Sequence, residues 1–139
     1  MNAVDTNVFV YFFDREEPTK QTQATELLDG LVQRPTRTVL LWQVAAELLS
    51  CLRRWETTGK RSSADVDSDI HDVLGIFPLA FPSKDVILRA LDLHSRYSLS
   101  HWDSMVVAAC IEAGVDTLYS EDLDEGTSYD SLEIVNPFR

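Results

Sequence analysis

Cysteine, histidine and long hydrophobic runs are scarce in this sequence, and each shortage excludes a class of protein. The 139 residues include two cysteines, Cys51 and Cys110, and three histidines. Both cysteines lie among apolar residues at helical spacing, which favours small buried side chains in a reduced protein over a disulfide. The Cys and His spacing of a zinc site is missing as well. The sequence therefore predicts neither a disulfide-stabilised fold nor zinc chemistry.

No hydrophobic run approaches the roughly 20 residues that a helix needs to cross a membrane. The first residues also lack the basic region and apolar core of a signal peptide, so we expect a cytoplasmic protein without membrane association. Internal repeats are absent, as are linkers rich in proline, glycine or serine. We expect residues 1–139 to form one domain, because this length is ordinary for a single hydrophobic core.

Basic residues are few as well. The chain has 12 Lys and Arg against 23 Asp and Glu, which gives a net charge of −11. This balance argues against broad, non-specific attraction to nucleic acid. The objection weakens if several acids share one metal site, because a bound divalent cation cancels part of their charge locally. The placement of the acids is therefore more informative than their number.

Short apolar segments alternate with helical patterns along the chain. Five segments have the composition of strands: residues 2–5, 38–41, 75–79, 117–120 and 132–135. Six have helical periodicity: residues 8–13, 21–32, 43–55, 64–74, 84–97 and 101–113, the last followed by Gly114 as a stop. This alternation predicts an α/β fold with a mainly parallel sheet covered by helices. Such sheets bind ligands beyond the carboxyl ends of their strands.

Asp5 is the only charged residue in the apolar run MNAVDTNVFVYFF. A buried carboxylate is costly unless it is paired, protonated or bound to a metal. Asp122 follows the fourth predicted strand as Asp5 follows the first, so a parallel sheet sets both at one rim. The neighbouring Glu121 and Glu125 are expected to be solvated. A calcium loop starting at Asp122 is excluded because Thr127 occupies the place of the required glycine.

Two predicted helices bring further acids to the border of the core. Glu47 lies at the edge of an apolar stripe, although an ordinary surface position also explains it. Asp103 shares a helical face with Val106 and Cys110. Alternatively, Asp103 closes a capping box with Ser100, which does not prevent its carboxylate from facing a pocket. Several carboxylates at one rim repel one another or bind a hard cation such as Mg²⁺ or Mn²⁺.

Because of these acids and the residues around them, the sequence resembles the PIN-domain ribonucleases, and most of all the VapC-type toxins of bacterial toxin–antitoxin pairs. The resemblance spans nearly the whole chain and rests on four local motifs: Asp5-Thr6-Asn7, Glu47 after WQV, SHWD ending at Asp103 and YSED ending at Asp122. It implies a three-layer α/β/α sandwich with a five-stranded, mainly parallel sheet. It also implies a cleft in which these four acids bind one or two Mg²⁺ or Mn²⁺ ions as the catalytic centre.

Supporting roles follow from the same resemblance. Asn7 is expected to orient the Asp5 carboxylate, and the hydroxyls of Thr6 and Ser120 to bond carboxylate or phosphate oxygens. Asp124 is expected to be an auxiliary metal ligand. The implied reaction is cleavage of RNA, commonly at one site in tRNA or ribosomal RNA, which leaves a 5′-phosphate and a 3′-hydroxyl.

The implied partners are the RNA substrate, a cognate antitoxin protein and a second copy of the chain. Arg53, Arg54, Lys60 and Arg61 are candidates for contacting the RNA backbone, or else complement the helix dipole from the end of a helix. The apolar run over residues 8–13 is expected to supply a partner surface, because it exceeds what one short helix usually buries. The three tryptophans, Trp42, Trp55 and Trp102, are expected in the core.

Other functions also deserve comparison with this one. A PIN-like scaffold that binds RNA or protein without cutting it would be favoured by a missing acid, but all four are present. A PIN nuclease outside toxin–antitoxin pairs has the same site. A phosphatase or phosphotransfer domain needs a second Asp where Asn7 stands, or a Lys where Glu121 and Asp122 stand. The residues therefore favour a metal-dependent endoribonuclease.

Overall fold

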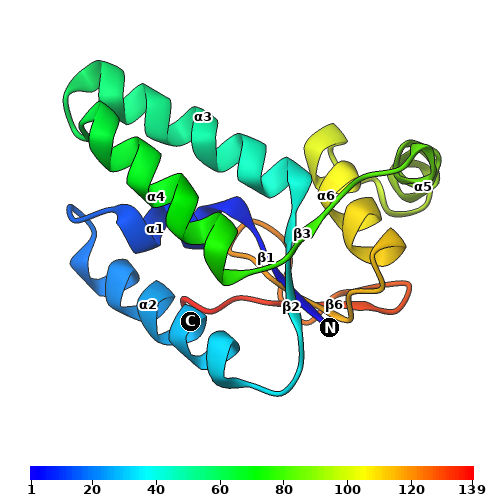
Figure 1. The fold of residues 1–139 in the computed structure, drawn as a ribbon. Coiled ribbons are helices and arrows are strands. Elements are labelled where there is room, and N and C mark those ends of the chain that lie inside the picture. The colour runs from blue at the N-terminus through cyan, green and yellow to red at the C-terminus, as the bar shows by residue number, and fades with distance from the viewer.

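Strands and helices alternate along the chain in the computed structural model, which describes all 139 residues (Figure 1). The strands are β1 (Asn2–Val4), β2 (Thr38–Leu41), β3 (Leu79–Ala80), β4 (Thr117–Tyr119), β5 (Ser128–Tyr129) and β6 (Leu132–Val135). The helices are α1 (Thr6–Phe13), α2 (Pro18–Gln33), α3 (Trp42–Thr58), α4 (Ser63–Ile76), α5 (Lys84–Tyr97) and α6 (His101–Glu112).

The strands form one sheet in the order β3-β2-β1-β4-β6-β5. All neighbours are parallel except β5 and β6, so the prediction of an α/β fold with a mainly parallel sheet is confirmed. The sheet has six strands instead of five. The additional strand is β5, whose two residues pair antiparallel with the start of β6 and are too few to show a periodicity.

The third strand was predicted at residues 75–79 but lies at Leu79–Ala80. Helix α4 instead continues through Gly75 to Ile76, and Phe77 behind it is extended. Pro78 explains the boundary, because a proline pushes the preceding residue out of the helical region. Strand pairing resumes there, where the Leu40 amide donates to the Pro78 carbonyl at 2.8 Å.

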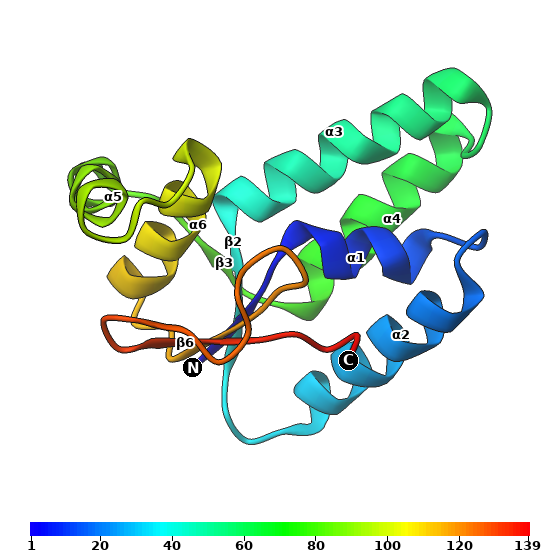
Figure 2. The same cartoon turned by 180° about the vertical axis from the view of Figure 1, so that it is seen from behind.

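The helices cover both faces of the sheet. The chain moves from β1 to β2 to β3 through α1–α4, then returns across β2 and β1 to β4 through α5 and α6. Right-handed crossovers in opposite directions put these two groups of helices on opposite faces. Figures 1 and 2 agree, with α1–α4 on one side of the sheet and α5 and α6 on the other.

The core lies between these layers. Strands β1 and β2 are buried along their whole length, as expected for parallel strands covered on both faces. Helix α3 contributes Val44, Leu48 and Leu52, which recur every four residues along one face and are each 0% exposed. The free cysteines agree with the sequence prediction, with Cys110 fully buried and Cys51 half-buried.

Helix α1 buries more of its apolar residues than the sequence predicted. Val8, Phe9 and Phe13 belong to the core, and Tyr11 and Phe12 pack against it, so the surplus expected over residues 8–13 is largely used inside the domain. These apolar side chains are covered because α1 lies between α2 and α3 and packs against both. The run therefore leaves less apolar surface for a partner than the sequence predicted.

Two of the three tryptophans expected in the core are exposed. Trp42 is 49% and Trp102 63% accessible to solvent, whereas Trp55 packs against the core from its edge. Both exposed residues occupy the first turn of a helix, where the side chain can extend past the end of the sheet.

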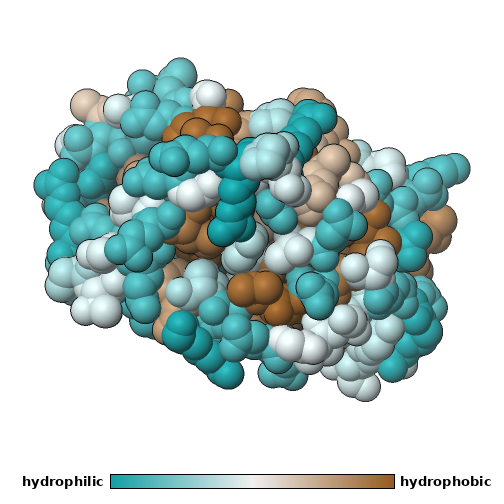
Figure 3. Space-filling model, turned by 90° about the horizontal axis from the view of Figure 1, so that it is seen from below, coloured by the Kyte–Doolittle hydropathy of each residue, from teal (hydrophilic) through white to brown (hydrophobic).

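The face of the molecule seen from below carries only small hydrophobic areas among hydrophilic side chains (Figure 3). None of the helices combines the length and hydrophobicity that crossing a bilayer requires.

Replacing Leu118 by alanine should lower the free energy of unfolding by about 2–5 kcal/mol, because a fully buried side chain leaves a cavity. Leu118 lies in β4, between β1 and β6, and is 0% exposed. The Leu74→Ala change deletes the same atoms from a half-exposed position on α4 and should cost about 0.5 kcal/mol. Urea denaturation measures both, and equal losses would contradict the assigned core.

Candidate active site

Asp5 links the ends of β1 and β4 to the start of α1. It is the N-cap of α1, where its Oδ1 accepts the Thr6 amide at 2.8 Å. Its Oδ2 accepts the Ser120 hydroxyl at 2.8 Å, and its own amide donates to the Tyr119 carbonyl at 2.9 Å. Only 8% of Asp5 is exposed, so the carboxylate is buried but has hydrogen-bond donors on both oxygens.

Glu47 and Asp122 accept hydrogen bonds from Thr6 and Asn7, the two residues that follow Asp5 in the chain. The Thr6 hydroxyl donates to Glu47 Oε2 at 2.8 Å, and Gln43 donates to Oε1 at 2.9 Å. The Asn7 amide nitrogen donates to Asp122 Oδ2 at 3.0 Å. The structure thus brings together Asp5, Glu47 and Asp122, which we call the acid cluster.

One supporting residue, Asn7, makes a different contact from the one expected, whereas the Ser120 and Thr6 hydroxyls bond carboxylates as expected. Asn7 contacts Asp122 in place of Asp5, because the oxygens of Asp5 face Thr6 and Ser120. The Ser120 oxygen also accepts the Asp122 amide at 3.2 Å, so this one hydroxyl joins two members of the acid cluster. Thr6 similarly joins Asp5 to Glu47.

Burial, more than repulsion within the acid cluster, determines the pKa of Asp5. Burial raises the pKa of Asp5 from 3.8 to about 6, against the opposing hydrogen bonds from Ser120 and Thr6. The charges of Asp122 and Glu47 raise the pKa further. The cluster therefore favours a proton or a cation at this position.

An open pocket of about 510 Å³ lies over the acid cluster. Glu47 and Asp122 line it together with Thr6 and Asn7. Its other lining residues are Val10, Tyr11, Ser50, Cys51, Arg54 and Glu121. This opening gives a ligand access to two of the three carboxylates from solvent.

Asp103 and Asp124 make no hydrogen bond with the acid cluster. Burial raises the pKa of the Tyr129 phenol, and the charges of Asp124 and Asp103 raise it further. Ser100 caps α6 by accepting the Asp103 amide at 3.3 Å. The return bond of a capping box, which α4 does form, is not made by the Asp103 carboxylate. Its oxygens are consequently free for a ligand.

The donor set suits Mg²⁺ or Mn²⁺ chemically, because hard cations prefer carboxylate oxygens and the acid cluster has unrelieved negative charge. No three acidic, histidine or cysteine side chains converge closely enough to ligate one ion as they stand. The carboxylates of the acid cluster instead accept hydrogen bonds from Thr6, Asn7, Gln43 and Ser120. Binding of a cation therefore requires these side chains to draw together.

A cluster beside the acids was missed from the sequence. The Tyr11 hydroxyl donates to Glu121 Oε2 at 2.7 Å, and Lys20 pairs with Glu121 Oε1. Burial alone would raise the pKa of Glu121, but the hydrogen bonds from Lys20 and Tyr11 lower it. Glu121 is therefore not the solvated residue that was expected. One signal was available, because Tyr11 follows Asn7 by one helical turn and so shares its face.

The four basic candidates separate into two groups. Arg54 lines the pocket over the acid cluster and donates to Ser50 at 3.1 Å, and Arg53 lines an adjoining hollow on α3. Lys60 and Arg61 instead turn inward. Gly59 ends α3 in the left-handed conformation at φ 82°, and the chain then directs Lys60 to Asp14 at 2.8 Å and Arg61 to Asp69 at 2.7 Å.

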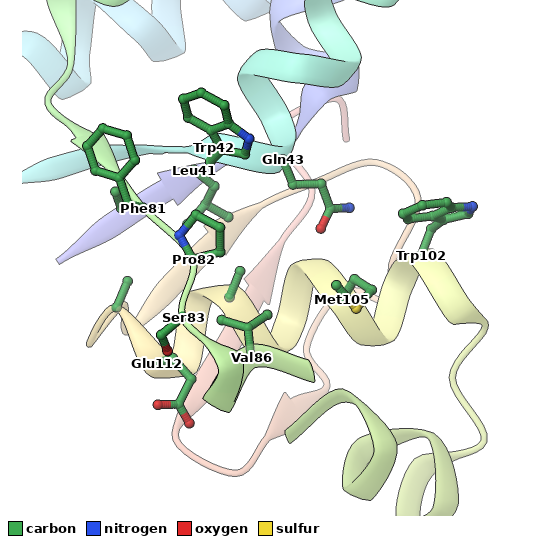
Figure 4. A pocket seen from close by; sticks show the side chains of 13 residues that line it. Leu41, Trp42, Gln43, Phe81, Pro82, Ser83, Val86, Trp102, Met105 and Glu112 are labelled. Carbon is green, nitrogen blue, oxygen red and sulfur yellow. The ribbon is translucent and has the colours of Figure 1, made fainter. Parts of the chain in front are cut away.

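An apolar groove of about 280 Å³ lies next to the acid cluster. Trp42 and Phe81 lie together on one side of it and Trp102 at the other end, with Gln43 between the two tryptophans (Figure 4). Gln43 and Trp102 also line a small hollow with Glu47. The groove and the acid cluster are therefore neighbouring parts of one surface.

Comparison with known proteins finds a family model. The model of the PIN domain matches residues 3–125. Among curated proteins none matches the sequence.

Several solved structures share the fold. A toxin–antitoxin complex from Klebsiella pneumoniae has 16% identity and a TM-score of 0.70, with 99% of this chain and 98% of that chain covered. VapC20 from Mycobacterium tuberculosis, described as a toxin that cleaves the sarcin–ricin loop, has 16% identity and a TM-score of 0.62 over 89% and 92%. VapBC2 from Rickettsia felis, bound to a fragment of its promoter DNA, has 15% identity and a TM-score of 0.68 over 97% of both chains.

The stability of the metal-free protein should depend on the charge of Asp5. Because the pKa of Asp5 is raised to about 6, the folded protein binds this proton more tightly than the unfolded chain. The resulting stabilisation is fully present below about pH 4 and is lost as the pH rises through about 6. A shift of this size corresponds to about 3 kcal/mol.

The Asp5→Asn variant cannot titrate here. Its free energy of unfolding should therefore gain about 2–3 kcal/mol relative to the wild type between pH 4 and pH 7. Urea denaturation in EDTA measures both proteins at each pH. Acids that do not interact with Asp5 contribute equally to the two curves, so curves that stay parallel would contradict the raised pKa of Asp5.

Proposed function

The chain belongs to the PIN-domain family, and from this premise we propose that it is a Mg²⁺- or Mn²⁺-dependent endoribonuclease and the toxin of a toxin–antitoxin pair. The observation that carries the nuclease proposal is the acid cluster at the end of two adjacent parallel strands, with a pocket above it. The toxin proposal is supported by the fold, which the chain shares with toxin–antitoxin proteins of three bacteria.

In this proposal Asp5, Glu47, Asp103 and Asp122 are the metal ligands, directly or through water, and Asp124 is auxiliary. When bound, a divalent cation activates the attacking water and stabilises the charge that develops on the phosphate oxygens. Thr6 and Ser120 keep Asp5 oriented by donating to its two oxygens.

Other residues of this chain prepare the site. Asn7 orients Asp122 through its side-chain amide, and Gln43 and Thr6 fix both oxygens of Glu47. These contacts hold the carboxylates at one rim in the metal-free protein, from which they must still draw together to bind a cation.

We propose that Arg53 and Arg54 contact the RNA backbone. Arg54 faces the pocket and Arg53 continues its line along the exposed side of α3, so a phosphate chain crossing the acids meets a local positive charge. Lys60 and Arg61 are left out because they are paired with acids, and the Arg61 side chain is only 10% exposed. The cleaved RNA is proposed to be a tRNA or ribosomal RNA in the cytoplasm, with products ending in a 5′-phosphate and a 3′-hydroxyl.

Removing a ligand charge should abolish the reaction. Asp5→Asn and Asp103→Asn should each slow RNA cleavage by at least about 100-fold while circular dichroism shows a folded protein, because volume is kept and charge is lost. A gel assay with labelled RNA and Mg²⁺ or Mn²⁺ measures the rate. Asp67→Asn, which changes an exposed carboxylate on α4, is the matched control and should cut like the wild type.

The same assay separates the competing functions. Wild-type rates in either variant would contradict the assigned site. A wild-type protein that binds RNA without cutting it favours the silent scaffold, and hydrolysis of a small phosphate ester in place of RNA favours a phosphatase. A small antitoxin gene next to this one distinguishes the toxin from a PIN nuclease outside such pairs.

A cognate antitoxin and a second copy of the chain are the proposed protein partners. We assign the second copy to the α5 face, which we define by the exposed side chains of Trp42, Phe81, Ile87, Leu88, Leu91 and Trp102. Trp42, Phe81 and Trp102 line the apolar groove, and α5, which carries the other three side chains, also lines it through Val86. A ring of one copy can enter the groove of the other in a two-fold arrangement. Helix α5 forms the outer edge of the molecule in both ribbon views and is open to such a contact.

Light scattering should give about twice the chain mass of 15.7 kDa for the wild type. The double change Leu88→Lys and Leu91→Lys should give a monomer, because it places charges in the apolar contact. Val32→Lys is the control, since Val32 is similarly exposed but lies on α2. A wild-type monomer at high concentration, or a double variant that stays dimeric, would contradict this assignment.

A further inference from the structure

A cation and a tyrosine hold the residue just before Asp122. The Tyr11 hydroxyl donates to Glu121 Oε2 at 2.7 Å and accepts a hydrogen bond from Lys20 at 3.0 Å. Lys20 closes the triangle by pairing with the other Glu121 oxygen. The Lys20 ammonium also lies 4.5 Å from the centre of the Tyr11 ring and 5.7 Å from that of Phe138. Helices α1 and α2 therefore meet at one carboxylate that no proposed metal ligand contacts.

Helix α1 also contacts the backbone of Glu121. Asn7 Oδ1 accepts the Glu121 amide at 3.3 Å, while Asn7 Nδ2 donates to the Asp122 carboxylate at 3.0 Å. Asn7 and Tyr11 are one turn apart on α1, so a single helix face binds two successive residues of the segment after β4. Because Glu121 is the residue next to Asp122 in the chain, its attachment to α1 limits how far Asp122 can move away from Asn7.

The negative charge of the segment after β4 opposes its position beside the acid cluster. The segment from Glu121 to Glu125 has four acids, and it approaches Asp5 and Glu47. Like charges at this distance repel, which drives the segment outward unless a cation opposes the movement. Two cations pair with this segment: Lys20 with Glu121, next to the acid cluster, and Arg139 with Glu125 at 3.4 Å. The Lys20 pairing neutralises the acid beside Asp122 without using the Asp122 carboxylate, which accepts a hydrogen bond from Asn7.

We propose that Tyr11 and Lys20 are positioning residues which, acting through Glu121, hold the segment after β4 so that Asp122 can bind a divalent cation together with Asp5. The proposal rests on the proposed metal-dependent function. It assigns a role to three residues outside the four-acid set, and it predicts that their loss weakens metal binding before it affects the chemical step.

The experiment measures metal binding without RNA. Tyr11→Phe and Lys20→Met are titrated with Mn²⁺ while the rise in Tm is followed from each variant's own metal-free value. The Mn²⁺ concentration that gives half of the rise should increase about tenfold in both, the lower end of the losses seen for outer-sphere partners. Lys20→Arg keeps the cation and should stay near the wild-type value. At saturating Mn²⁺, RNA cleavage by the variants should return to within about threefold of the wild type.

Tyr97 provides a matched control. Its hydroxyl donates to Asp130 at 3.1 Å beside Arg96, the same combination of tyrosine, acid and cation, but on α5. Tyr97→Phe should therefore leave the Mn²⁺ midpoint unchanged. An NaCl series of equal ionic strength removes the general screening of the net charge of −11.

The outcomes separate two failures. If Tyr11→Phe and Lys20→Met lower only the metal-free Tm and leave the Mn²⁺ midpoint unchanged, their role is merely structural and the positioning proposal is overturned. If Tyr97→Phe shifts the midpoint equally, the effect is not specific to Glu121 and the proposal is overturned as well. If the wild type shows no Mn²⁺ response beyond that of NaCl, the metal site fails, and the positioning role fails with it.

Discussion

Repulsion between carboxylates at one rim of the sheet is the constraint around which this site is built. Parallel pairing of β1 with β4 brings the segments after both strands together, and each starts with an acid at or near its first position. Such acids destabilise the fold when they are buried or half-buried, unless hydrogen-bond donors or cations compensate for their negative charge. Helix α1 supplies much of that compensation, because its first turn donates to Asp5, Glu47 and Asp122 through Thr6 and Asn7.

The sequence predicted those parts of the structure that follow from local pattern. Alternation of strands and helices gave the class of the sheet, and position after a strand gave the rim location of Asp5 and Asp122. A stripe of apolar residues placed Glu47 at the edge of the core, where the structure also has it. Each of these inferences needed only periodicity and the geometry of parallel sheets.

What the sequence did not predict depends on contacts between distant segments. The pairing of Lys20 with Glu121 joins residues 101 positions apart, and neither has a pattern that names the other. Trp42 and Trp102 were placed in the core by composition, but their positions at helix starts leave them exposed. Arg61 was chosen for its charge and its place after α3, whereas the turn at Gly59 leads it to Asp69. Tertiary geometry decides in each case.

The bond between Asp5 and Ser120 spans 115 residues, and this separation has a consequence for synthesis. Strand β1 leaves the ribosome well before its neighbour β4 and the acids that follow β4. Contacts between residues so far apart in sequence form late, because closing the long loop between them costs conformational entropy before the contact adds any stability. A nascent or truncated chain that stops before β4 has Asp5 and Glu47 but no Asp122 opposite them. The nuclease site we propose thus remains incomplete until the segment after β4 has been translated, which delays any activity toward RNA at the ribosome that is making it.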